Sequence, residues 1–243
     1  MKPTLKVQRH ELKFYISRSD YEYVRHILSH LMDRDEFQKD DRGYFIRSLY
    51  FDDASDSSVE EKLDGIERRD KYRLRIYDPQ QNWAKLERKR KVNHYVSKSS
   101  VTVSKEEAAT MMEGNYDFLL NKKGDAAKSI YFDLSRKYFR PVVIIDYIRD
   151  AYKMSYNEIR ITFDKHIRTT TADLDLFNEN LITHPLQRND TIIMEIKFNT
   201  CLPSWFKDFL KFESNVNTAI SKYCYGRMEM REFHHADSVC SLH

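Results

Sequence analysis

The sequence predicts an α+β protein dominated by antiparallel strand pairing. Several short segments alternate charged and apolar residues with a period of two, most clearly over Tyr72–Tyr77, which is typical of strands with one polar face. Other segments carry apolar residues at helical spacing, and they are set apart from runs of strands. The 243 residues are 41% hydrophobic and 13% aromatic, which is enough for one large core.

The first half of the chain begins with a strand over Val7–Ile16, with His10, Leu12, Phe14 and Ile16 on one face and Arg9, Glu11, Lys13 and Tyr15 on the other. A helix follows, capped by Ser17 or Ser19, with Tyr21, Val24, Ile27, Leu28 and Leu31 at helical spacing. The next elements are a strand over Tyr44–Phe51, an acidic turn or helix start over Asp52–Asp56, and a hairpin of Lys71–Tyr77 and Trp83–Val92 around Pro79.

The second half continues with a strand over Val96–Val103 and a helix over Lys105–Leu120. A second hairpin is predicted from Leu134–Ile148 and Ser155–Phe163, and Asp164–Thr171 leads to a less regular stretch. Thr191–Phe198 is the last strong strand, and the helices Pro203–Phe212 and Asn217–Phe233 close the chain. Because no linker, repeat or low-complexity run interrupts this pattern, we expect one domain over residues 1–243.

The charge balance excludes a uniformly basic surface. There are 41 basic and 38 acidic residues, for a net charge of +3, so an anion site must come from local clustering. The five glycines form neither a GxxxxGK[ST] nor a GxGxxG loop, which excludes a P-loop nucleotide fold.

The cysteines and the N-terminus predict a soluble, cytoplasmic protein. Cys201, Cys224 and Cys240 are odd in number and widely spaced, as expected of free thiols in a reducing compartment. The N-terminal residues lack the apolar region of a signal peptide, and no run approaches the roughly 18–20 apolar residues of a membrane span.

The charged strand faces indicate a channel lined with cations. Arg73 and Arg75 share one face, with Lys71 in phase, and two adjacent guanidiniums are stable only when an anion or carboxylate lies between them. A solvated outer face is the ordinary explanation for one such strand. Five strands repeat the pattern, however, which favours converging faces.

Four glutamates recur beside the basic residues of these strands. Each lies two residues from a basic residue; the pairs are Glu11 with Lys13, Glu87 with Lys89, Glu158 with Arg160, and Glu195 with Lys197. One interpretation is that these glutamates form cross-strand ion pairs inside a polar barrel. The other is that one or two of them bind Mg²⁺ or Mn²⁺ through oxygen. Both interpretations can hold together. Glu195 is the preferred ligand, with Glu11, Glu87 and Glu158 as possible helpers.

Other catalytic schemes lack support in the sequence. The nine histidines show no HExxH spacing, His10 lies on the apolar face of its strand, and there is no GxSxG elbow. Lys222, in Ser221-Lys222-Tyr223, is either a surface lysine or a residue that reaches over a barrel mouth.

Eight ordered blocks resemble the VTC domain, the polyphosphate polymerase module of the vacuolar transporter chaperone family, within the CYTH-like triphosphate tunnel metalloenzymes. The resemblance covers about residues 6–230 and leaves a short C-terminal tail. The blocks are Arg9-His10-Glu11-Leu12-Lys13, Ser48-Leu49-Tyr50-Phe51-Asp52, Tyr72-Arg73-Leu74-Arg75, Leu86-Glu87-Arg88-Lys89, residues 146–152, Ile159-Arg160-Ile161-Thr162-Phe163-Asp164, Met194-Glu195-Ile196-Lys197 and Ser221-Lys222-Tyr223.

The resemblance implies a closed eight-stranded antiparallel β-barrel, a triphosphate tunnel, with flanking helices and a C-terminal helix at its mouth. Its implied phosphate ligands are Lys13, Arg73, Arg75, Lys89, Arg149 and Lys197, with Lys222 acting at the mouth and Glu195 holding Mn²⁺ or Mg²⁺. Arg9, Lys98 and Arg160 are weaker matches. Arg9 replaces the first glutamate of the ExExK pattern common in the superfamily, which fits the polymerase branch better than the triphosphatase or cyclase branches.

The implied activity is transfer of the γ-phosphate of ATP to a growing polyphosphate end, with release of ADP. Two alternatives remain open: a hydrolase of tripolyphosphate, a nucleoside triphosphate or an RNA 5′-triphosphate, and a non-catalytic module that binds polyphosphate or nucleotides. Generic nucleic-acid binding is not expected, because stacking aromatics are not interleaved with the inward cations. The SPX sensor and membrane helices of the eukaryotic polymerase subunit do not occur in this sequence.

Overall fold

The computed structural model describes residues 9–93, 95–186, 191–209 and 220–230. The chain forms two compact units, each described here by itself. Unit 1 comprises Met1–Phe45, Tyr147–Ile167 and Gln187–Ile220, and unit 2 comprises Ile46–Asp146, Arg168–Leu186 and Ser221–His243. The expectation of a single domain stays a prediction.

The strands pair antiparallel, as the sequence predicts. They are β1 (Arg9–Ile16), β2 (Asp33–Arg34), β3 (Tyr44–Asp52), β4 (Arg68–Ile76), β5 (Trp83–Val92), β6 (Tyr95–Ser104), β7 (Arg140–Met154), β8 (Ile159–Thr170), β9 (His184–Pro185) and β10 (Ile192–Asn199). The order is β1-β10-β8-β7 in unit 1 and β7-β3-β4-β5-β6 in unit 2, because β7 contributes residues to both.

The expected closed eight-stranded barrel is corrected in two respects. The sheet has ten strands, since the two-residue strands β2 and β9 pair with β7 and β8 beside the main path of eight. Within the described residues, no pairing joins β1 to β6, the two ends of that path. Alternation of charged and apolar residues fixes which face of a strand is polar, but it does not determine whether the end strands pair.

Unit 1 packs helices against the apolar face of its strands. Helix α1 (Arg18–Leu31) has Ser17 as its N-cap, whose side chain accepts a hydrogen bond from the Asp20 backbone N–H. The helix buries Tyr21, Val24 and Leu28. These side chains join the even-numbered residues of β1 and β10 in one core, to which α5 (Ser204–Phe209) adds Phe206. The odd-numbered residues of β1 and β10 therefore lie on the opposite, polar face.

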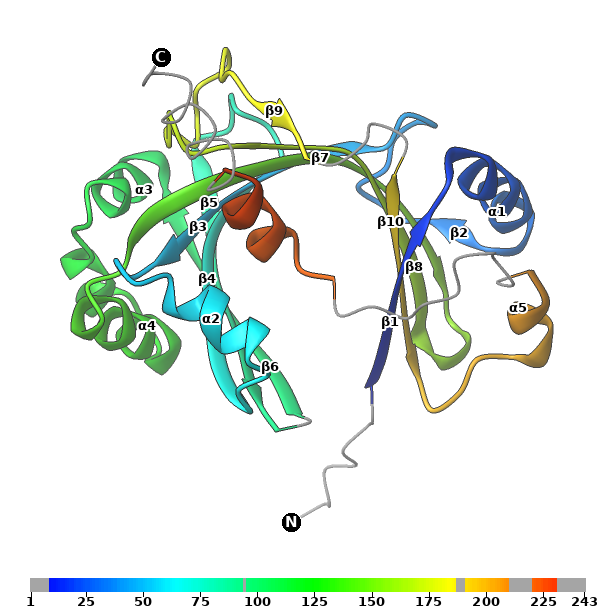
Figure 1. Cartoon of the computed structure of the whole chain (residues 1–243), viewed down its shortest axis with the longest axis horizontal. Helices are drawn as coiled ribbons and strands as arrows, with labels where there is room; N and C mark the ends of the chain where they lie inside the picture. The colour runs from blue at the N-terminus through cyan, green and yellow to red at the C-terminus, as the bar shows by residue number, and fades with distance from the viewer. Residues whose placement is uncertain (1–8, 94, 187–190, 210–219, 231–243) are drawn as a thin grey trace, which may run out of the picture. The chain divides into compact units, whose positions relative to one another are not determined.

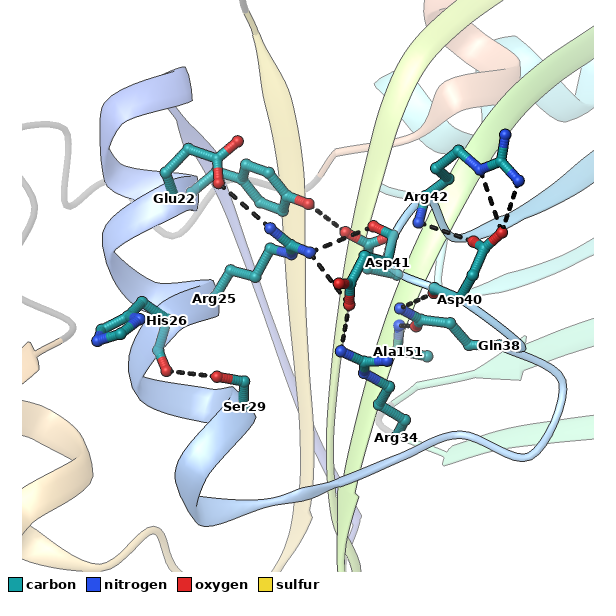
Figure 2. A network of polar contacts seen from close by, with 12 residues as sticks. Glu22, Arg25, His26, Ser29, Arg34, Gln38, Asp40, Asp41, Arg42 and Ala151 are labelled. Atoms are coloured by element: carbon teal, nitrogen blue, oxygen red, sulfur yellow. Dashed lines mark hydrogen bonds and ion pairs between the residues drawn. The ribbon is translucent and has the colours of Figure 1, made fainter.

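A network of arginines fixes the segment between β2 and β3 against α1 and β7 (Figure 2). Arg25 and Arg34 both pair with Asp41. The Gln38 side chain accepts a hydrogen bond from the Ala151 backbone at 2.8 Å. The carboxylate of Asp35, in the same segment, is thereby held close to β8.

Unit 2 packs its apolar face against α3 (Lys105–Met112), the 3₁₀ turn η1 (Asp117–Asn121) and α4 (Asp125–Arg136), which Figure 1 shows in green. The core combines Leu74, Ile76 and Leu86 of the sheet with Met111 and Ile130 of these helices. The short helix α2 (Ser57–Leu63) follows β3. As in unit 1, the alternate strand residues lie on a polar face.

One helix in this region ends earlier than predicted, and one strand begins later. The predicted helix Lys105–Leu120 ends at Met112, followed by Gly114 with a φ of +85°, a conformation that favours glycine. Leu134, the predicted first residue of a strand, lies in α4, a helix that was not predicted from the sequence. The strand β7 begins only at Arg140. The spacing of Ala127, Ile130 and Leu134 was the helical signal available in the sequence.

A helical segment over residues 222–230 packs on the polar side of the unit 2 sheet. Gly226 permits this close approach, because a Cβ there would lie 2.6 Å from Ile145 Cδ1 and 3.1 Å from Thr169 Oγ1. Arg227 pairs with the carboxylate of Asp56 at 2.7 Å. The segment appears in red in Figure 1.

The remaining predictions have mixed outcomes. The strand Trp83–Val92 is confirmed, and the strand predicted over Ser155–Phe163 is β8 preceded by the turn η2 (Tyr156–Glu158). The predicted closing helices, Pro203–Phe212 and Asn217–Phe233, fall partly on residues 210–219 and 231–243. Those residues, which include Cys240, lie outside the described residues. Cys201 and Cys224 are free thiols. Among the described helices, none is long and apolar enough to cross a membrane.

Candidate functional site: two charged sheet faces

The polar face of unit 2 is set by the register of β4, β5 and β6. Arg73 lies opposite Glu87, and Arg75 lies opposite Lys85. Lys89 lies between Lys71 on one side and Lys98 on the other. The period of two, combined with this register, places side chains from three strands on one face.

Glu87 lies at the centre of this face and is almost fully buried. Its carboxylate accepts a hydrogen bond from Arg73 Nε at 2.7 Å, lies 3.8 Å from Arg75 Nη1 and pairs with Lys98. Burial alone would raise the pKa of Glu87, but Arg73, Arg75 and Lys98 outweigh it and lower the pKa to about 2. Glu87 is therefore ionised at neutral pH.

One carboxylate does not balance this face. In the described strands β4, β5 and β6, the face carries eight cationic residues and one acidic residue, Glu87. The cations are Arg69, Lys71, Arg73, Arg75, Lys85, Lys89, Lys91 and Lys98. The side chain of Lys85 has no hydrogen bond or ion pair among the described residues, although it is only partly exposed. Such an excess favours an anionic ligand.

Hydroxyl groups from β3 complete the face. Ser48 accepts a hydrogen bond from Arg75 Nε at 3.3 Å, and Tyr50 accepts one from Arg73 Nη1 at 3.2 Å. Burial acts to raise the pKa of the Tyr50 phenol, but Arg73, Arg75 and Lys222 outweigh it and the pKa is lowered. Lys222 therefore acts electrostatically on this face.

The polar face of unit 1 carries a glutamate between two lysines. Glu195 pairs with Lys197 on its own strand and lies 3.2 Å from Lys13 Nζ on β1. Lys13 also pairs with Glu11 at 2.8 Å. Burial opposes ionisation of Glu195, but Lys13, Lys197 and Arg149 hold its pKa well below the ordinary value.

The two arginines predicted as phosphate ligands in unit 1, Arg149 and Arg160, also have carboxylate partners. Arg149 on β7 forms a bidentate pair with Asp164 on β8, at 2.6 and 2.8 Å, and both residues are buried. Arg160 pairs with Asp35, a residue outside its own strand, at 2.9 Å. Unlike unit 2, this face matches each of these cations with a carboxylate.

The donors beside Glu195 fit a hard divalent cation. Thr162 lies directly opposite Glu195 in the β8–β10 register, and its Oγ1 is buried without a hydrogen-bond partner among the residues that the structure describes. Glu11 adds a more exposed carboxylate on the same face. Carboxylate and hydroxyl oxygens are the donors that Mg²⁺ and Mn²⁺ use, together with water and phosphate.

The other predicted helpers do not fit such a site. Both oxygens of Glu87 are held by cations. Glu158 lies in η2 with a φ of +47°, and it is exposed rather than aligned with Arg160 on a strand face. Its predicted position on the strand was wrong because the chain turns at Asn157 before β8 begins.

The structure brings the predicted phosphate ligands together in two groups. Lys13, Arg149, Arg160 and Lys197 lie in unit 1, whereas Arg73, Arg75, Lys89, Lys98 and Lys222 lie in unit 2. Arg9 begins β1, but its side chain lies outside what the structure describes.

Several residues on these faces have no role that the sequence pattern predicts. They are Ser48, Tyr50, Lys71, Lys85, Thr162, Asp35 and Asp164. Lys71 and Lys85 share the alternation of Arg73 and Glu87, so the signal was present. Asp35 precedes a long irregular segment and gives no such signal.

Structural comparison finds related folds. A putative adenylyl cyclase from Hippeastrum, described as having a dominant triphosphatase activity, has a TM-score of 0.52 and 15% identity, over 90% of this chain and 95% of that chain. A putative adenylate cyclase from Bacillus halodurans has a TM-score of 0.49 and 14% identity, over 88% and 95% of the two chains.

The comparison with curated proteins finds no match. The sequence matches the VTC domain family over residues 8–231, which is most of its length and includes every strand described above. This match agrees with the eight ordered blocks of the sequence and with the antiparallel sheet that carries them. The chain therefore belongs to the VTC domain family.

Proposed function

We propose that this protein binds inorganic polyphosphate or triphosphate and catalyses phosphoryl transfer, with synthesis of polyphosphate from ATP as its reaction. The observation that carries the proposal is the charge of the unit 2 face, where eight cations surround one carboxylate in the described strands. A chain of phosphates has regularly spaced negative charge and presents oxygen atoms to every one of these groups.

The arginines and lysines of this face have different roles in the proposal. Arg73 and Arg75 present planar guanidiniums that bind phosphate oxygens bidentately, and Glu87, Ser48 and Tyr50 orient them. Lys85 and Lys89 act as point charges. Phosphoryl transfer requires little covalent chemistry from a protein, so these groups act by aligning phosphates and stabilising charge on the transferred group.

A divalent metal belongs to the same proposal. Glu195 would hold it, with Glu11 and Thr162 as nearby oxygen donors. When bound, Mn²⁺ or Mg²⁺ would neutralise part of the charge on the phosphate oxygens. Lys13 and Lys197 keep Glu195 ionised and therefore able to coordinate a cation.

Membership of the VTC domain family supports polyphosphate as the product. Hydrolysis of a triphosphate is the second candidate, and the Hippeastrum protein with a related fold, described as having a dominant triphosphatase activity, favours it. Both candidate reactions need the same cationic face to bind the phosphates. They differ in whether a phosphate chain or water accepts the transferred group. The cytoplasmic location expected from the sequence stays a prediction.

Product analysis tests the proposal. The protein is incubated with ATP and Mn²⁺ or Mg²⁺, and polyphosphate, ADP and orthophosphate are resolved by gel and ³¹P NMR. Long chains with ADP support the polymerase, and orthophosphate without chains supports the hydrolase. Equal turnover by the wild type and by the Glu195→Ala/Arg75→Ala double variant would exclude catalysis at these faces.

A further inference from the structure

Two histidines lie one turn apart on the exposed side of α1 in unit 1. His26 and His30 are four residues apart, so they project from the same face of the helix. Both are exposed, whereas Val24 and Leu28 of the same helix are buried in the core. Figure 2 shows His26 pointing away from the polar network around Arg25. The two rings are therefore accessible to a ligand from solvent.

A hydrogen bond determines which nitrogen of His30 is available. Its Nδ1 lies 2.8 Å from the backbone carbonyl oxygen of His26. Because a carbonyl oxygen only accepts, Nδ1 carries the proton, and in the neutral ring the lone pair lies on Nε2. Ser29 Oγ lies 3.3 Å from this Nδ1, but its hydroxyl donates to the same carbonyl at 2.7 Å, so it does not donate to Nδ1.

Histidines that bind metals have this arrangement. The nitrogen that does not coordinate the metal donates to a carboxylate or a backbone carbonyl, which fixes the tautomer and the orientation of the ring. Among the residues that the structure describes, His30 Nε2 has no hydrogen bond, and neither ring nitrogen of His26 has one. Lone pairs on both rings are thus left for a ligand.

The separation of the two rings matches a shared metal ion. Their centroids lie 4.9 Å apart, and their planes are inclined at 67°. A metal–nitrogen distance of about 2.0–2.1 Å places the ion roughly 3.2 Å from each centroid. Two imidazoles at the roughly 90° of square-planar or the roughly 109° of tetrahedral coordination then have centroids about 4.5–5.2 Å apart. The observed separation lies inside this range, so rotation about side-chain bonds is enough to reach one ion.

The neighbouring turn of the helix does not supply a third ligand. Glu22, one turn before His26, pairs with Arg25 at 3.5 Å, as Figure 2 shows. The described part of the chain contains no group of three or more histidine, cysteine or acidic residues placed to hold a metal. Two protein ligands leave the remaining positions to water, which is typical of an exchangeable ion rather than of a closed structural site.

We propose that His26 and His30 form a surface site for a divalent cation of the Zn²⁺, Ni²⁺ and Cu²⁺ class. His30 Nε2 and one ring nitrogen of His26 are the ligands, and water completes the coordination. Imidazole suits these ions, whereas Mg²⁺ and Mn²⁺ prefer oxygen donors such as those beside Glu195. The site is independent of the proposed function, because it uses a different face of unit 1 and a different class of metal.

Nuclear magnetic resonance of the full-length protein tests the ligand assignment. Long-range ¹H–¹⁵N spectra of the histidine side chains are recorded at about pH 8, where imidazoles are neutral. Without metal, His30 should be in the Nδ1–H tautomer. On titration with Zn²⁺, Nε2 of His30 and one nitrogen of His26 should shift with the same midpoint. His26→Gln and His30→Gln assign the two rings. An Nε2–H tautomer of His30, or metal shifts confined to other histidines, would overturn the site.

Calorimetry with Ni²⁺ tests the chelate itself. His26→Gln and His30→Gln should each weaken binding at this site about tenfold or more, because one imidazole cannot hold the ion as a pair does. His30→Gln/Leu31→His is the matched control: it keeps the number of histidines but places the second ring about 140° around the helix from His26. Leu31 is exposed, and circular dichroism melts establish that each variant is folded. The control should bind as weakly as His30→Gln, and wild-type affinity in the control would contradict the proposal.

Discussion

At the scale of single residues, the difference between Arg75 and Lys98 is informative. Arg75 is buried, donates to Ser48 and lies beside Glu87, whereas the Lys98 side chain is 54% exposed and pairs only with Glu87 among the contacts described. A pre-oriented guanidinium loses less freedom when it binds phosphate than an exposed lysine does.

We therefore expect Arg75→Ala to reduce kcat/KM for polyphosphate formation or triphosphate hydrolysis about 100-fold, and Lys98→Ala less than 10-fold. Steady-state kinetics with a fixed metal concentration measures both. Lys91→Ala, on the same face, serves as a control for general loss of charge. A larger loss in Lys98→Ala than in Arg75→Ala would contradict this assignment.

Glu87 couples the cationic face to stability. Its pKa in the folded protein is about 2, below the ordinary value of roughly 4.3, so its contribution is present above the ordinary value and is lost as the pH falls toward 2. The difference corresponds to about 3 kcal/mol at neutral pH.

Glu87→Gln should lower the free energy of unfolding at pH 7 by about that amount and should flatten its decline between pH 5 and pH 2. Denaturant unfolding at several pH values measures this. Glu113→Gln, at the exposed end of α3, is the control. An unchanged pH dependence in Glu87→Gln would show that the carboxylate is not held by the three cations.

Glu195 and Thr162 give a prediction about metal binding that is independent of turnover. If the buried hydroxyl orients a ligand of the metal, Thr162→Val should weaken Mn²⁺ binding about 10-fold, and Glu195→Gln should weaken it more. Electron paramagnetic resonance of free Mn²⁺ in titrations measures both affinities. Thr102→Val, on the unit 2 face, is the matched control. Wild-type affinity in Glu195→Gln would exclude this site.

At the scale of elements, the helical segment 222–230 is held on the sheet by several contacts, among them the ion pair of Arg227 with Asp56. Asp56 has a φ of +54° at the start of α2, and its carboxylate receives both Nε and Nη2 of Arg227. The segment is helical, and Arg227 Nη1 also donates a hydrogen bond to the Val142 carbonyl of β7.

Asp56→Asn should loosen this segment, because an amide cannot balance the guanidinium. We expect faster hydrogen exchange over residues 222–230, with little change in β4 and β5. Glu229→Gln removes an equal charge from the same segment at a residue with no ion pair among the described residues, and it should leave exchange unchanged. Equal exchange in both variants would mean that Arg227 does not anchor the segment.

The elements also show where sequence patterns succeed. The strands β1, β5 and β10 follow from strict alternation, and α1 follows from its cap and its apolar stripe. In contrast, α4 buries a shorter row of apolar side chains. The turn at Asn157 has a left-handed backbone conformation, and no glycine there indicates it in the sequence. Local context overrides propensity at such positions.

At the scale of the whole molecule, the near-neutral net charge of +3 conceals an uneven distribution. The described strands of unit 2 concentrate cations on one face, and unit 1 pairs its cations with carboxylates. Long-range attraction of a polyanion therefore arises from one face rather than from total charge.

Polyphosphate affinity should accordingly fall steeply with salt, since each neutralised phosphate releases counterions. Removing Lys85 or Lys89 should reduce the slope of log affinity against log salt by about one each. Filter binding from low to moderate salt measures the slope. Retained affinity for duplex DNA above about 0.2 M salt, with none for polyphosphate, would reverse the ranking of ligands.

The sequence by itself determined the α+β class, the antiparallel strands and the polar face of each, because side-chain alternation is a local property of the backbone. It also determined that Arg73 and Arg75 share a face of one strand. Only the tertiary structure decided which charges meet. Strand register, and the segments that carry Asp35 and Ser221, bring together residues that are not neighbours in the chain, so that Arg160 meets Asp35, Lys71 meets Ser221 and Arg149 meets Asp164.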